Sequence, residues 1–106
     1  MAKHIVVWTK TADLQFIGIL EYWVRRNKST KFSKKLIQLV SERTNQIAEK
    51  PFLCKSTDFT DVRVASLRNF SIYYKITDTQ IIISAFWDNR QDFKKLLELL
   101  QNKNNL

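Results

Sequence analysis

The 106-residue sequence contains one glycine, one proline, one cysteine and one histidine. A single glycine excludes the glycine-rich loops that cradle phosphates, because those loops need several glycines at fixed spacing. A single cysteine (Cys54) and a single histidine (His4) exclude a disulfide framework and the common zinc sites. No apolar run approaches the roughly 18 residues of a membrane-spanning helix, and the start of the chain lacks the apolar core of a signal peptide. We therefore expect a cytoplasmic protein without a metal or another cofactor.

The composition indicates a globular, strongly basic domain. Apolar residues make up 44% of the chain and aromatic residues 12%, which excludes a disordered tail. The length is typical of one domain, so we expect a single domain over residues 1–106.

The net charge is +8, and its excess is local. No acidic residue lies between Glu21 and Glu42, whereas this stretch holds Arg25, Arg26, Lys28, Lys31, Lys34 and Lys35. Such a cluster favours an acidic partner, either a nucleic acid or an acidic protein, although net charge also serves solubility.

Two long helices are predicted in the first half of the chain. Apolar residues recur there at helical spacing, first at Phe16, Ile19, Leu20 and Trp23, and then at Phe32, Leu36, Leu39, Val40 and Ile47. The second pattern ends before Pro51, and so few residues separate the two helices that they must form an antiparallel hairpin. Leu14 and Tyr22 fall outside the first stripe, so this helix is expected to contact more than one neighbour. Gly18 within it predicts close backbone packing.

The second half of the chain changes to the two-residue period of strands. The predicted strands are His4–Trp8, Val62–Leu67, Phe70–Ile76 and Gln80–Trp87. Two links are short enough for hairpins, Arg68–Asn69 and Thr77–Thr79, so the last three strands are expected to form an antiparallel meander with His4–Trp8 at an edge. Residues 52–61 are predicted to be a loop and residues 93–100 a short final helix.

The predicted order is therefore β-α-α-β-β-β-α. A helical hairpin buries its apolar stripe only by covering one face of the sheet. The sequence thus predicts an α+β fold in which the hairpin packs on an antiparallel meander.

Two stretches of the second half carry a more specific pattern. In VRVASLRNFSIYYKI, Arg63 is followed seven residues later by Phe70, and then by Ile72 and Tyr74. In FWDNRQDFKKL, a strand ends at aromatic residues shortly before Arg90. With the element order, these residues resemble the RelE/ParE family of bacterial type II toxins, from His4 to about Leu97.

The resemblance implies one of two activities. RelE-like members cleave mRNA in the ribosome and use arginine, lysine and usually a C-terminal tyrosine or histidine in acid–base chemistry. ParE-like members inhibit DNA gyrase and are not known for nuclease chemistry. Here no tyrosine or histidine follows Arg90, Phe93 cannot transfer a proton, and Ser71 lies where nuclease relatives often carry arginine. The sequence is therefore identified as closer to ParE than to RelE.

The candidate target- or phosphate-binding residues are Arg63, Arg68, Tyr73, Lys75, Trp87 and Arg90. Arg63 and Arg90 are expected on one surface, formed by the sheet and its closing turn, where guanidinium groups could hold phosphate. Tyr73 and Lys75 share a strand face, which allows either a Tyr–Lys pair or a partly exposed aromatic that awaits a partner. Trp87 is expected in packing more than as a stacking platform.

Other polar residues have structural interpretations. Asp88 and Asp92 flank Arg90 and predict an ion pair or a cap for the final helix. Arg43, within the second apolar stripe, predicts either a packed stem with a solvated head or a cation that faces a groove. His4 is expected to be an ordinary strand residue, and no residue is assigned a catalytic role.

The resemblance implies a toxin of a plasmid-stabilisation type of toxin–antitoxin module. It would bind a target such as DNA gyrase and form a hetero-oligomer with a small acidic antitoxin, which would lie in the groove between the helical hairpin and the sheet. The alternatives are a ribosome-dependent mRNA interferase that uses Arg63, Lys75 and Arg90, and a basic nucleic-acid-binding module.

Overall fold

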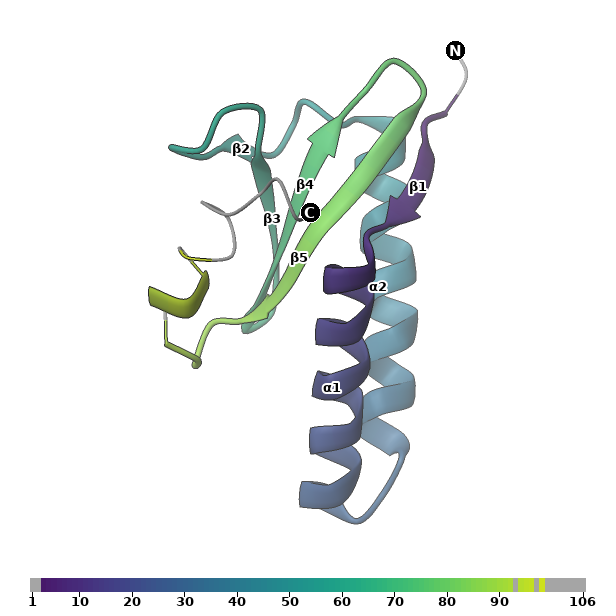
Figure 1. Ribbon diagram of the computed structural model, residues 1–106. Helices are drawn as coiled ribbons and strands as arrows, with labels where there is room; N and C mark the ends of the chain where they lie inside the picture. Colours follow the sequence, from purple (N-terminus) through teal and green to yellow (C-terminus); the bar gives the residue numbers. More distant parts are fainter. Residues whose placement is uncertain (1–2, 93, 97, 99–106) are drawn as a thin grey trace.

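A computed structural model describes residues 3–92, 94–96 and 98 (Figure 1). Its elements are β1 (Ile5–Trp8), α1 (Lys10–Asn27), α2 (Lys31–Glu49), β2 (Lys55–Ser56), β3 (Arg63–Leu67), β4 (Phe70–Ile76) and β5 (Gln80–Asp88). The strands form one sheet in the order β1-β5-β4-β3-β2. β1 is parallel to β5, and the other neighbouring strands are antiparallel. The expected α+β fold, the meander and the edge position of β1 are confirmed.

Local side-chain bonds explain where α1 begins. The Thr9 hydroxyl accepts a hydrogen bond from the Ala12 amide (3.1 Å) and donates one to the Ile83 carbonyl of β5 (2.9 Å). Asp13 lies in the first turn, where a carboxylate interacts favourably with the helix dipole. One threonine therefore starts the helix and joins it to the sheet.

The turn between the helices is short. α1 ends at Asn27, and the capping residue Lys28 that follows has a left-handed conformation with φ of 52°. At the start of α2, the Ser29 hydroxyl accepts from the Lys31 amide (3.2 Å), while Thr30 makes no capping bond with its side chain. α2 ends at Glu49, just before Pro51.

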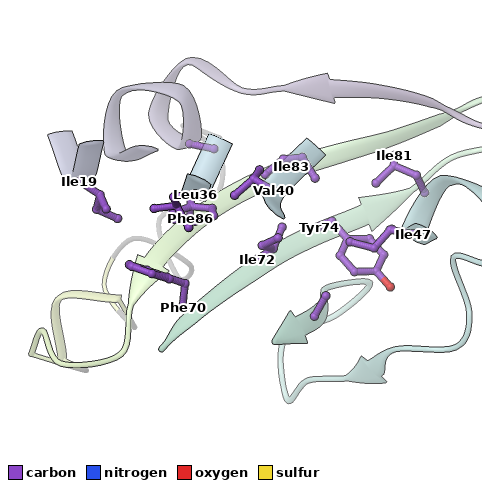
Figure 2. Packing of buried hydrophobic residues seen from close by; sticks show 12 residues of the cluster. Ile19, Leu36, Val40, Ile47, Phe70, Ile72, Tyr74, Ile81, Ile83 and Phe86 are labelled. Atoms are coloured by element: carbon purple, nitrogen blue, oxygen red, sulfur yellow. The ribbon is translucent and has the colours of Figure 1, made fainter. Parts of the chain in front are cut away.

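The main core lies between the hairpin and one face of the sheet (Figure 2). Its fully buried side chains come from α2, β4 and β5 and include Leu36, Ile47, Phe70, Ile72, Tyr74, Ile81, Ile83 and Phe86. α1 adds Phe16, whose ring centre lies 4.8 Å from that of Phe86. Burial of such side chains supplies most of the driving force for folding.

A second, smaller cluster lies on the opposite face of the sheet. Ala85 and Trp87 of β5 pack there with Leu96, and Phe59 and Tyr73 border them. Leu96 belongs to the three helical residues Lys94–Leu96. These residues and Glu98, which is also helical, confirm part of the predicted final helix, whereas residues 93, 97, 99 and 100 of that prediction lie outside the described residues.

Two local expectations are wrong. The predicted loop at residues 52–61 contains β2, whose two residues pair with β3 and are too few to show a strand period. A Cβ atom added at Gly18 would meet nothing within 4 Å, so this glycine does not serve close packing. No helix in the described part of the chain is long and apolar enough to cross a membrane.

Candidate functional site

A groove of about 610 Å³ runs between α1 and the end of β5. It is lined by Leu14, Gln15, Gly18, Ile19, Tyr22 and Arg25 of α1, by Phe86, Trp87 and Asp88 of β5, and by Arg90 and Gln91. Gly18 keeps the α1 wall open because it has no side chain. Leu14 and Tyr22 remain 57% and 46% exposed, so the groove offers apolar surface to solvent. We call it the α1–β5 groove.

The groove exists because β1 is shorter than β5. The pairing of β1 ends at Trp8 and Ile83, so the rest of β5 has no strand on that side. α1 lies beside this part of β5 instead, and the Gln15 side-chain oxygen accepts a hydrogen bond from the Phe86 amide (2.9 Å). A side chain thus satisfies one backbone donor where a strand would otherwise pair.

Asp88 and Arg90 form a two-point ion pair at one end of the groove. Arg90 Nε donates to Asp88 Oδ1 (2.9 Å), and Nη2 donates to Oδ2 (2.6 Å). The Arg90 backbone amide also donates to Oδ1 (3.0 Å), and the guanidinium lies 4.6 Å from the centre of the Trp23 ring. Asp92 accepts a bond from the Lys94 amide (3.0 Å). The expected ion pair and cap are confirmed.

The ion pair keeps both groups charged. Burial raises the pKa of Asp88, but the hydrogen bonds and the charge of Arg90 outweigh burial and hold the pKa below its ordinary value. The hydrogen bond to Asp88 raises the pKa of Arg90, and this effect exceeds that of desolvation. Neither group can therefore exchange a proton near neutral pH.

Arg63 lies at the other end of the sheet. It pairs with Tyr74 across β3 and β4, whereas Asp88 pairs with Phe70 at the opposite end of β4. The structure therefore does not bring Arg63 and Arg90 together, and the expectation of one shared surface is wrong. The antiparallel register over the seven residues of β4 separates them.

Arg63 is engaged in holding the segment after α2. Its Nη1 donates to the Cys54 carbonyl (2.7 Å) and the Phe52 carbonyl (3.4 Å), and its guanidinium lies 5.1 Å from the Phe52 ring centre. The hydroxyl of the buried Tyr74 donates to the Pro51 carbonyl of the same segment (2.7 Å). These bonds explain why an irregular segment keeps a defined position.

Of its two expected environments, Arg43 has the second, because it lines a small groove of about 270 Å³ between the end of α2 and the segment that follows it. Its Nε donates to the Ser66 carbonyl (3.1 Å), its Nη1 to Gln46 Oε1 (3.0 Å), and its Nη2 contacts Cys54 Sγ (3.7 Å). The guanidinium therefore links α2 to β3.

Of the remaining candidates, Tyr73 and Trp87 lie together in the second cluster, Lys75 shares the strand face of Tyr73, and Arg68 lies apart from them. Arg68 is exposed in the β3–β4 turn, at the same end of the sheet as Arg90, and has φ of 55°. Tyr73 and Lys75 are half-buried on β4, and no hydrogen bond joins them. Burial raises the pKa of Tyr73 more than a hydrogen bond with Ser71 lowers it, so its phenol stays protonated at neutral pH. Trp87 is only 6% exposed and cannot act as a stacking platform.

Two polar residues considered from the sequence have structural partners. His4 Nε2 lies 3.1 Å from the Thr77 carbonyl, and Ser71 Oγ donates to Asn89 Oδ1 (2.9 Å). Gln15, which lines the groove, was not identified from the sequence, whereas Arg25 was assigned only to the basic cluster. Leu14 and Tyr22 were detectable because they fall outside the buried stripe of α1.

The groove is thus an exposed, partly apolar surface on an α+β scaffold, with a fixed ion pair at one end. The sequence also matches a known protein family. Residues 6–93 match the family model described as the ParE toxin of the type II toxin–antitoxin system, parDE. The chain therefore belongs to the ParE toxin family.

Solved structures support the fold. A chain from the chromosomal ParDE TA system of P. aeruginosa is similar, with a TM-score of 0.69 and 17% sequence identity. The likeness covers 79% of this chain and 94% of that chain. No curated protein sequence matches the chain.

Proposed function

We propose that this ParE-family toxin arrests growth by binding a target such as DNA gyrase, and that an acidic antitoxin neutralises it. The observation that carries the proposal is the set of contacts made by Arg90, which lies just after β5. It is held by Asp88 at two points and covers Trp23. An arginine so engaged stabilises the fold and the end of the groove, and it is a poor candidate for binding the charge of a cleaved phosphate.

The arrangement of the other candidates also favours binding over RNA cleavage. An mRNA interferase would need Arg63, Lys75 and Arg90 around one phosphate. Arg63 is bonded to backbone carbonyls at the far end of the sheet, and Lys75 lies on the face that the helices do not cover. These three residues therefore do not form one centre.

The α1–β5 groove suits an antitoxin segment with both apolar and acidic side chains. Leu14 and Tyr22 offer exposed apolar contact, and Arg25 supplies positive charge beside it. An amphipathic helix or an extended segment could cover the apolar wall, while an acidic residue faces Arg25. The net charge of +8 would speed the encounter.

Growth under induced expression tests the function. We expect arrest on induction of the chain, and recovery when a small acidic protein encoded beside it is co-expressed. A purified translation system tests the alternative, because an mRNA interferase would cleave ribosome-bound mRNA at defined codons. Codon-specific cleavage by the purified chain would contradict the proposal.

A matched pair of variants tests the groove. Leu14→Glu puts a carboxylate on the apolar wall and should weaken antitoxin binding at least tenfold, or about 1.4 kcal/mol. Ile37→Glu makes the same change at a residue of α2 that is 49% exposed and does not line the groove, and it should leave binding unchanged. Equal loss in both variants would place the antitoxin elsewhere.

A further inference from the structure

The turn between α1 and α2 carries a dense positive patch that the groove does not explain. We define the hairpin tip as Arg25, Arg26, Lys28, Lys31, Lys34 and Lys35, all of which are exposed. Figure 1 shows this turn projecting beyond the sheet, at the end of the molecule far from the β4–β5 turn. Among the described residues, the one ion pair within 4.0 Å joins Arg90 and Asp88, so no carboxylate neutralises the tip.

Several of these cations lie where local structure disfavours them. Lys28 adopts a left-handed conformation with φ of 52°, which glycine or asparagine adopts at lower cost. Lys31, Lys34 and Lys35 fall within the first five residues of α2, and its first turn contains no acidic residue. Positive charge at a helix N-terminus opposes the helix dipole. Stability therefore does not account for these lysines, and residues that break a local rule often mark a functional surface.

The aromatic rings nearest the tip are engaged elsewhere. Trp23 contacts Arg26 of the tip at 6.0 Å, Arg90 at 4.6 Å, and Phe32 and Tyr22 at 5.1 and 5.2 Å between ring centres. Tyr22 is 46% exposed and lines the α1–β5 groove. Binding of single-stranded nucleic acid relies on bases stacked on free aromatic rings. A regular array of phosphates, as in a duplex, needs only lysine and arginine.

We propose that the hairpin tip binds the phosphate backbone of duplex DNA without reading its sequence. Two packed helices are together about 20 Å wide, more than the roughly 12 Å major groove of B-DNA. The tip would therefore lie against the outside of the duplex, where its cations can approach several phosphates of the backbone at once. Arg25 also lines the α1–β5 groove, whereas the other five cations of the tip lie outside it. The test below therefore replaces lysines of α2, which the groove does not include.

The salt dependence of DNA binding tests the proposal. The purified chain is titrated against a fluorescent duplex of arbitrary sequence at 50–200 mM salt, and anisotropy gives the affinity. If six cations each neutralise a phosphate, the affinity should fall about 2,000-fold across this range, and about 40-fold for the triple variant Lys31→Ala, Lys34→Ala, Lys35→Ala. The triple variant should also melt no lower than the wild type, because the removed charges oppose the helix dipole.

A control of equal charge separates the tip from net charge. Lys3, Lys50 and Lys55 are exposed and lie outside the tip, and their replacement by alanine should leave the salt dependence near that of the wild type. An equal reduction in both triple variants would overturn the proposal. So would tighter binding to a single strand of the same length, or equal displacement of the DNA by polyglutamate.

Discussion

Replacing Arg90 tests whether the segment that follows β5 stabilises the folded protein. Arg90→Ala removes two charge-assisted hydrogen bonds and the contact with Trp23, and it leaves an Asp88 carboxylate whose side chain is 8% exposed. Charge-assisted bonds contribute about 1.5–3 kcal/mol each, and an unpaired buried charge adds a further cost. The Arg90 side chain is 50% exposed, which reduces these values by screening. We expect a loss of about 2–4 kcal/mol.

The reciprocal variant should cost less. Asp88→Asn leaves Arg90 without its partner, but the half-exposed guanidinium can be hydrated. We expect a loss of about 1 kcal/mol, and the double variant should lose less than the sum of the single variants because they remove one shared interaction. For a chain of this length, 1 kcal/mol corresponds to roughly 4 °C in melting temperature.

Acid should reduce the difference between Arg90→Ala and the wild type. The folded-state pKa of Asp88 is lowered, so its ion pair contributes fully above the ordinary pKa of the carboxyl and is lost as the pH falls through the folded-state value. Thermal melts of both proteins are compared at pH 7 and at pH values stepped downward from about 4, the ordinary pKa of an aspartate. Equal losses for Arg90→Ala and Asp88→Asn at pH 7, or a strictly additive double variant, would refute the reasoning.

Three further variants probe other parts of the structure. Gly18→Ala should raise stability by about 0.5–1 kcal/mol in a thermal melt, because the added Cβ meets nothing within 4 Å in a helix interior. Unchanged or lower stability would contradict the conclusion that Gly18 lies on an open wall of the α1–β5 groove. Tyr74→Phe should cost about 1–2 kcal/mol in urea unfolding, since it leaves the Pro51 carbonyl without its buried donor. Arg63→Ala should make the thiol of Cys54 react faster with a thiol reagent, because the bond to the Cys54 carbonyl is lost, while the melting temperature falls by only a few degrees. An unchanged rate would show that the segment does not depend on Arg63.

Much of the scaffold follows from short-range patterns. The stripes of α1 and α2 and the alternation in β4 are repeated several times, so each element is indicated by more than one residue. The ion pair could also be predicted from the sequence, because Asp88 and Arg90 are only two residues apart at the end of a strand. Local spacing is sufficient for both.

Features that depend on register and on neighbouring elements were not predictable. The separation of Arg63 from Arg90 follows from strand pairing, which sequence spacing alone does not give. A glycine within a helix can allow close packing of a neighbouring element or can leave the wall of a groove open. For Gly18, only the position of β5 distinguishes these two interpretations. β2 forms because β3 offers a partner, with no pattern of its own.

Negative supercoiling of relaxed plasmid by purified DNA gyrase, measured with increasing amounts of the wild-type chain, tests the central claim most directly. The account predicts that the chain inhibits supercoiling, that an acidic antitoxin added in equimolar amount restores it, and that no RNA is cleaved. Full gyrase activity in the presence of a large excess of folded chain would contradict gyrase as the target.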